Sequence, residues 1–130
     1  MTASRRLLVV DDHKEFADLV VDVAARLGFD ARSTNSAREF KEFYSAETPD
    51  VVVLDIVMPE SDGIELIQWL INSGYHGRIV VATGYGPMYA NAAKVLGEGR
   101  GPIAITTLRK PATLAEIRAC LNEDDRPDAS

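Results

Sequence analysis

The chain has 130 residues, of which 46% are hydrophobic, which suffices for one complete core but not for two ordinary domains. Its formal net charge of −6 and pI near 4.8 disfavour direct binding to nucleic acid, because an acidic surface repels a polyanion. Cys120 is the only cysteine, which excludes a disulfide framework within the chain, and no apolar run resembles a signal peptide or a membrane span. We therefore expect a single cytoplasmic domain that binds neither nucleic acid nor membrane directly.

The first part of the chain alternates short apolar runs with amphipathic segments. Gly28 follows a run of apolar residues at helical spacing and is placed to end that helix, while Ser36 and Glu39 form a capping box at the start of the next. The elements expected here are a strand over 7–10, a helix over about 16–27, a strand over 29–33, a helix over about 36–46 and a strand over 51–55.

The second part continues the same alternation. Thr113 and Glu116 form a second capping box, which predicts the start of the last helix. The expected elements are a helix over about 62–72, a strand over 79–82, a helix over about 88–96, a strand over 103–107 and a helix over about 114–121. Five strands that alternate with five helices predict a parallel sheet covered on both faces, which is a doubly wound α/β sandwich.

Polar side chains stand at the ends of four predicted strands. Asp11 and Asp12 follow the first strand, Asp55 ends the third, Thr83 follows the fourth, and Lys110 lies beyond the fifth. In a parallel sheet these ends meet at the carboxyl edge, where open α/β sheets bind ligands. Three converging carboxylates need a cation, and oxygen ligands with room for water favour Mg²⁺.

This combination of groups is suited to placing a phosphoryl group on Asp55. The Asp55 carboxylate would attack, while Mg²⁺ and the Lys110 ammonium would share the phosphoryl oxygens and the Thr83 hydroxyl would bind a third. Catalysis would then consist mainly of positioning and electrostatic stabilisation.

At this point the chain resembles the receiver domain of two-component response regulators over almost its whole length. The residues that carry the resemblance are Asp11-Asp12, Asp55-Ile56-Val57-Met58-Pro59 with Asp62-Gly63 after it, Thr83, and Lys110-Pro111. The resemblance implies a flavodoxin-like sheet of order 2-1-3-4-5 and phosphotransfer from a histidine kinase or phosphotransfer protein to Asp55. It also implies Mg²⁺ bound by Asp12, Asp55 and the Val57 carbonyl, with Asp11 acting through water, and a cis bond before Pro111.

The resemblance further implies a signal read out on the face formed by the fourth helix, the fifth strand and the last helix, where two copies could also dimerise. Receivers usually carry an aromatic residue three positions before the lysine, but this chain has Thr107, so Tyr85 is the alternative candidate for a mobile aromatic switch. The passage around Tyr85 and the glycine-rich segment over 97–102 are similar to receivers fused to cyclic-di-GMP phosphodiesterase domains. The expected partners are thus a kinase and an effector protein or a fused output domain.

Two other classes of function remain open. A phosphatase of the haloacid-dehalogenase type also forms an aspartyl phosphate, but it needs an acid two residues after the nucleophile, and that position is Val57. A pseudo-receiver would be an unphosphorylated interaction module, and Thr107 and the glycine-rich segment over 97–102 are the features that suggest it. His13 and His76 lack a second histidine at metal-ligand spacing and are interpreted as solvated or structural. The receiver is expected to span residues 1–122, with 123–130 as a flexible tail or truncated linker.

Overall fold

The computed structural model describes residues 5–55, 63–84 and 104–122, and the fold is given for these ranges. Their helices and strands in chain order are β1 (Arg6–Val10), α1 (Lys14–Arg26), β2 (Asp30–Thr34), α2 (Ala37–Ala46), β3 (Val51–Asp55), α3 (Gly63–Asn72), β4 (Arg78–Thr83), β5 (Ala104–Arg109) and α5 (Leu114–Asn122). Within them, no helix has the length and apolar character that a membrane crossing requires.

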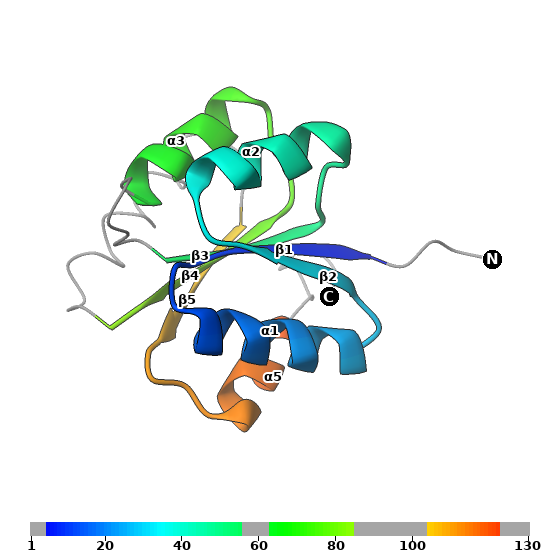
Figure 1. Ribbon diagram of the computed structural model, residues 1–130, viewed down its shortest axis with the longest axis vertical. Helices are drawn as coiled ribbons and strands as arrows, with labels where there is room; N and C mark the ends of the chain where they lie inside the picture. Colours follow the sequence, from blue (N-terminus) through cyan, green and yellow to red (C-terminus); the bar gives the residue numbers. More distant parts are fainter. Residues whose placement is uncertain (1–4, 56–62, 85–103, 123–130) are drawn as a thin grey trace.

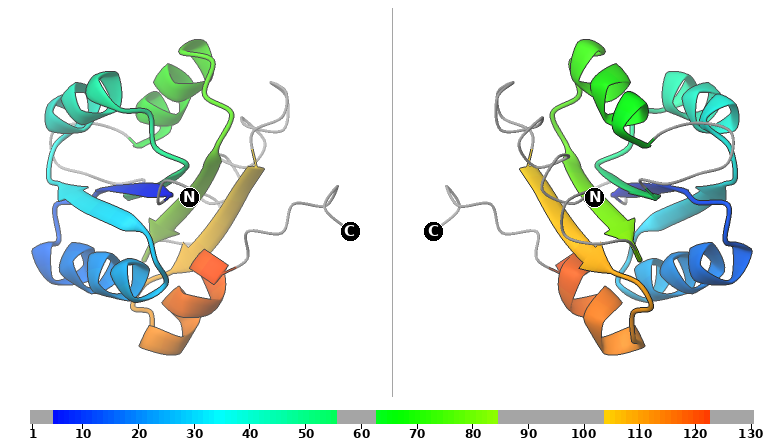
Figure 2. Two further views of the ribbon diagram at one scale, coloured as in Figure 1. Left: turned by 90° about the vertical axis from the view of Figure 1, so that its right-hand side faces the viewer. Right: turned by 90° about the vertical axis from the view of Figure 1, so that its left-hand side faces the viewer.

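The five strands form one parallel sheet in the order β2-β1-β3-β4-β5. Helices α1 and α5 cover one face, whereas α2 and α3 cover the other, as Figure 1 shows and the two side views in Figure 2 confirm. The predicted doubly wound α/β fold and its strand order are therefore confirmed. The helix predicted over about 88–96 lies outside the described residues.

Strand β3 lies at the centre of the sheet and is buried along its whole length. Val51 and Val53 pack with the residues of α1 and α5, while Val52 and Leu54 pack with those of α2 and α3. A continuous run of β-branched and aliphatic residues suits this position, because both faces of a parallel sheet are covered by helices. The carboxylate of Asp55 is thus carried to the edge of the sheet on a strand that is buried along its whole length.

The predicted helix boundaries are confirmed by their capping contacts. Gly28 follows α1 with φ +96°, a conformation that glycine adopts without steric cost. The Ser36 hydroxyl accepts a hydrogen bond from the Glu39 N–H at 3.2 Å. At α5 the box is reciprocal, since the Thr113 hydroxyl accepts from the Glu116 N–H at 3.1 Å and the Glu116 carboxylate accepts from the Thr113 N–H at 2.9 Å.

Strand β5 runs two residues further than the sequence predicts. Its pairing with β4 continues through Leu108 and Arg109, which lie opposite Ala82 and Thr83. Leu108 is buried in the α1 and α5 core, and this burial keeps the chain in the sheet. Because the strand ends at Arg109, Lys110 emerges directly at the carboxyl edge.

Candidate functional site

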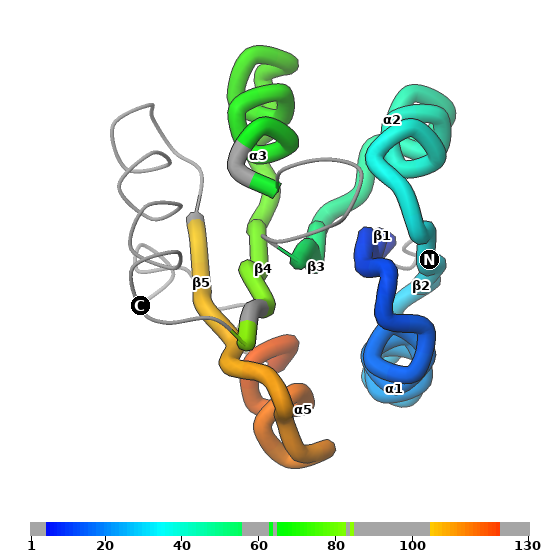
Figure 3. The backbone as a smooth tube through the Cα atoms, turned by 60° about the vertical axis from the view of Figure 1, so that its left-hand side comes forward, coloured from blue at the N-terminus to red at the C-terminus, as the bar shows by residue number. Residues whose placement is uncertain are grey.

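The carboxyl ends of the parallel strands lie along one edge of the sheet, and Figure 3 shows the strands side by side in the order β2-β1-β3-β4-β5. Asp11 follows β1, Asp55 ends the neighbouring β3, and Lys110 follows β5. All three therefore stand where the parallel strands end. The fold brings these predicted site residues together.

Lys110 links the two buried acids. Its Nζ donates a hydrogen bond to Asp11 Oδ2 at 3.0 Å and to Asp55 Oδ2 at 3.3 Å. The side chains of Asp11 and Asp55 are only 1% and 4% exposed, and that of Lys110 is 13% exposed. Two carboxylates removed from water in this way require a close cation, because an uncompensated buried charge costs several kcal/mol. Lys110 supplies that charge.

The aromatic ring of Phe16 holds Lys110 from the side of α1. The ammonium nitrogen lies 4.7 Å from the centre of the ring, within the range of a cation–π contact. The peptide bond from Lys110 to Pro111 is cis, as the resemblance implies. The lysine side chain is thus fixed by an aromatic ring as well as by two carboxylates.

Asp12 and His13 complete the cluster. One ligand atom from each of Asp11, Asp12, His13 and Asp55 can be chosen so that all lie within 4.8 Å of one another. The side chain of Asp12 is 30% exposed, so it faces the mouth of the site and not its floor. Carboxylate oxygens with access to water are the ligands that Mg²⁺ prefers, and the residues present therefore fit such an ion.

The sequence reasoning missed the part played by His13. Its side chain is 65% exposed, as expected for a solvated residue, but its Nδ1 lies 3.1 Å from Lys110 Nζ and 3.3 Å from Asp11 Oδ1. Its position directly after the two acids at a strand end was the available signal, but without a second histidine at ligand spacing it was interpreted as solvated or structural. His76, in contrast, lies in the turn before β4, at the opposite edge of the sheet.

The remaining predicted site residues are described only in part. Thr83 ends β4, next to the residue opposite Asp55, but its side chain is not among those described. Thr107 lies in β5 opposite Val81 and is exposed. Val57 and Tyr85 lie outside the described residues.

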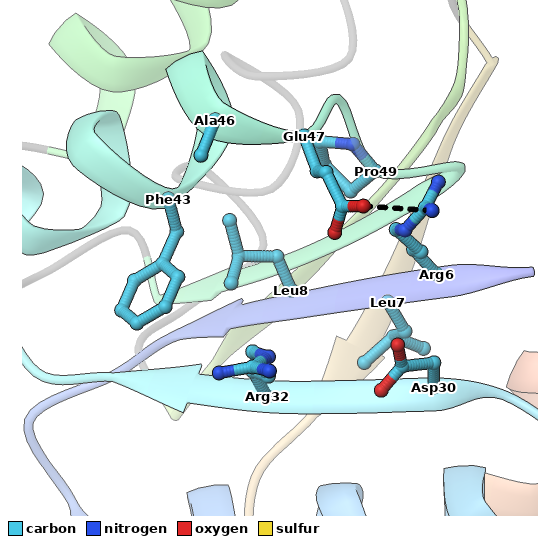
Figure 4. A pocket seen from close by; sticks show the side chains of 9 residues that line it. All are labelled: Arg6, Leu7, Leu8, Asp30, Arg32, Phe43, Ala46, Glu47 and Pro49. Atoms are coloured by element: carbon cyan, nitrogen blue, oxygen red, sulfur yellow. Dashed lines mark ion pairs between the residues drawn. The ribbon is translucent and has the colours of Figure 1, made fainter.

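A separate cavity lies at the other edge of the sheet, between the start of β1, the start of β2 and the end of α2 (Figure 4). Its volume is about 210 Å³, and an ion pair of 2.9 Å between Arg6 and Glu47 crosses its rim. None of the converging acids or Lys110 lines it. The chemistry suggested by the sequence is therefore not located in this cavity.

Comparisons with solved structures identify the fold. The chemotaxis response regulator CheY4 of Vibrio cholerae superposes with a TM-score of 0.81 at 21% identity, covering 95% of this chain and 100% of that one. A receiver domain from Clostridium thermocellum gives a TM-score of 0.74 at 24% identity, covering 92% and 93%. The architecture is that of CheY-like receiver domains.

The family follows from the sequence comparisons. A family model described as the response regulator receiver domain matches residues 7–122. The chain is 31% identical over 119 residues to the photosynthetic apparatus regulatory protein RegA of Cereibacter sphaeroides, covering 92% of this chain and 62% of RegA. The chain belongs to the receiver-domain family of two-component response regulators.

A relative of similar length is sporulation initiation phosphotransferase F of Bacillus subtilis, 28% identical over 116 residues, which covers 88% of this chain and 89% of that protein. Other curated relatives are much longer, and the chain spans only 27%, 18% and 24% of three of them. The family is a signalling domain and not a classical enzyme, and its longer members carry further regions beyond the part matched here.

Proposed function

We propose that this chain is a phosphorylated receiver, in which Asp55 accepts a phosphoryl group from a histidine kinase or phosphotransfer protein. The observation that carries the proposal is the pairing of the buried Asp55 carboxylate with Lys110 Nζ at 3.3 Å, beside Asp11. A buried acid at a strand end, with a cation fixed beside it, is suited to nucleophilic attack on an anionic donor.

The transfer is a displacement at phosphorus. An Asp55 carboxylate oxygen forms the new bond to phosphorus, the bond to the donor histidine nitrogen breaks, and its electron pair returns to that nitrogen. Negative charge spreads over the phosphoryl oxygens, and the Lys110 ammonium stabilises it from a position already set by Asp11 and Phe16. The chain thus performs both transfer and later hydrolysis on itself, without acting on a separate substrate.

A magnesium ion would be held by Asp12, Asp55 and the Val57 carbonyl, with Asp11 acting through water. The support for this is the donor set, since the acids of the cluster offer ligand oxygens in close proximity. When bound, the ion supplies further neutralisation of the phosphoryl oxygens.

The signal follows from the charge that phosphorylation adds, about −1.5 to −2 at neutral pH. We assign Thr83 as the hydroxyl that binds the new oxygens, because it follows the residue paired with Asp55. Thr107 and Tyr85 are the proposed switch positions.

The readout face comprises β5, α5 and the predicted helix over 88–96. It would contact an effector protein, a fused output domain linked to cyclic-di-GMP, or a second copy of the chain in the cytoplasm.

The test is phosphoryl incorporation from a small phosphodonor, measured by intact mass with and without Mg²⁺. The wild-type chain should gain one acid-labile phosphoryl group only with Mg²⁺, and Asp55→Asn should gain none. Asp22→Asn is the matched control, since this exposed aspartate on α1 pairs with Arg26 and with no other described residue. Incorporation into Asp55→Asn at the wild-type level would contradict the assigned acceptor.

A pseudo-receiver is the alternative favoured by the exposed Thr107, where the family usually has an aromatic residue. It would show neither Mg²⁺ binding in calorimetry nor incorporation by the wild-type chain. Steady turnover of a phosphomonoester would instead indicate the dehalogenase-type phosphatase.

A further inference from the structure

His13 lies at the mouth of the acidic site, immediately before α1. Its backbone N–H donates to Asp11 Oδ1 at 2.8 Å, which fixes the position of the residue relative to the buried acid. Its ring is then close to three carboxylates, with Nδ1 at 3.3 Å from Asp11, 3.7 Å from Asp12 and 3.7 Å from Asp55. The imidazole therefore belongs to the same cluster as the acids.

The ring nitrogen that faces the cluster is Nδ1. It lies 3.1 Å from Lys110 Nζ, which only donates, and 3.3 Å from Asp11 Oδ1, which only accepts. In the tautomer that carries its proton on Nε2, Nδ1 accepts from Lys110 and directs its lone pair into the cluster. This lone pair is the one that a metal ion would use.

The exposure of the ring favours this use. Because 65% of the His13 side chain is exposed, an ion that enters from solvent can reach the ring. Most of the ring would stay in contact with water when the ion binds. The side chains of Asp11 and Asp55, by contrast, are almost wholly buried and offer carboxylate oxygens on the inner side of the site. Asp11 and Asp55 would offer oxygen ligands, and His13 a nitrogen ligand, to an ion held by this cluster.

We infer that His13 contributes a nitrogen ligand to the cation site and shifts its preference away from Mg²⁺ toward borderline first-row ions such as Co²⁺ and Zn²⁺. Mg²⁺ binds oxygen and gains little from imidazole, whereas Co²⁺ and Zn²⁺ bind imidazole well. The inference rests on the proposed function for the location of the cation site, but it concerns ion selectivity and not phosphotransfer.

The test is the dissociation constant of Mg²⁺, Co²⁺ and Zn²⁺ for the untagged chain, measured by calorimetry for wild type, His13→Ala and His13→Asn. Losing even an outer-shell partner of a metal ligand costs about 10–100-fold in affinity, so the preference for Co²⁺ over Mg²⁺ should fall at least about tenfold in His13→Ala. His13→Asn restores an oxygen donor and should not restore the preference. The visible absorption of bound Co²⁺ should also change when the nitrogen is lost.

His76→Ala is the matched control, because this second histidine is exposed and lies at the opposite edge of the sheet. It should keep the wild-type preference. An unchanged preference in His13→Ala, an equal loss in His76→Ala, or an equal weakening of all three ions in His13→Ala would each overturn the inference. Phosphoryl incorporation by the wild-type chain with Mg²⁺ is scored separately. Its absence would contradict the proposed function while leaving the ion preference to be judged on the binding data.

Discussion

The two edges of the sheet each hold a largely buried cation, and they use it differently. At the carboxyl edge, Lys110 contacts two carboxylates, an imidazole and an aromatic ring. At the amino edge, Arg78 begins β4, and its Nη2 donates to the Cys120 carbonyl in the last turn of α5 at 2.9 Å. The first cation faces groups that can bind a ligand, whereas the second satisfies the backbone of a helix.

The surroundings of the amino edge support this structural role. The Tyr75 hydroxyl donates to the Arg78 carbonyl at 3.3 Å, and burial, followed by the nearby Asp50 carboxylate, raises the pKa of Tyr75. This hydroxyl therefore stays protonated and remains a donor. Among the described residues, Arg78 Nη1 is buried and has no hydrogen-bond partner. The amino edge thus fixes the ends of elements, while the carboxyl edge gathers reactive charge.

The largest expected effect is on the cation of the carboxyl edge. Lys110→Met should lower the rate of phosphoryl incorporation by about 100-fold, because removing one preplaced donor to a developing oxyanion typically costs this much. The measurement is the initial rate by intact mass with a small phosphodonor and Mg²⁺. Lys14→Met is the control, since the Lys14 side chain is 85% exposed and, within the described part of the chain, pairs with Asp18 alone. Equal rates of phosphoryl incorporation for wild type and Lys110→Met would contradict a chemical role for the cation at the carboxyl edge.

The next effect is on the cation of the amino edge. Arg78→Ala should lower the free energy of unfolding by about 1–3 kcal/mol, because the Cys120 carbonyl loses its buried donor. Urea denaturation measures this loss. Phosphoryl incorporation by the folded fraction should stay at the wild-type rate. A variant that keeps its stability but loses incorporation would show that this edge also takes part in the chemistry.

The smallest effect concerns the repulsion within the acidic cluster. Asp12→Asn should raise the free energy of unfolding by about 1 kcal/mol, the usual gain when a strained functional site is relieved, while weakening Mg²⁺ binding. Asp12 has no ion pair with Lys110 among the described interactions, and its 3.7 Å contact with the His13 ring is an ion pair only when the imidazole is protonated, so its removal mainly lowers repulsion. Urea denaturation in the absence of divalent ions is the measurement. A less stable variant would indicate that Asp12 holds the cluster together.

Much of the fold could be predicted because its signals are local. The apolar runs before Asp11 and Asp55 gave the strands, and the capping pairs Ser36 with Glu39 and Thr113 with Glu116 gave helix starts. The ends of the strands then indicated the edge at which polar groups would meet. These inferences needed only neighbouring residues and the rule that parallel strands end on one side.

Other features could not be read in this way. Arg78 lies just before the strand predicted over 79–82, and nothing near it in the sequence indicated that it is buried. Its buried side chain donates to the carbonyl of Cys120, 42 positions later. The extra length of β5 depends on the pairing of Leu108 with Ala82 and on its burial against the helices. In each case the deciding contact comes from another element.

The sequence by itself determined the alternation of strands and helices and the order in which acids, threonine and lysine follow the strands. Only the tertiary structure decided that Lys110 Nζ lies 3.0 Å from Oδ2 of Asp11, a residue 99 positions away. It also decided that the His13 ring contacts the same lysine. The physical reason is that hydrophobic periodicity acts over a few residues, whereas such distances are set by strand order, register and the packing of helices on both faces of the sheet.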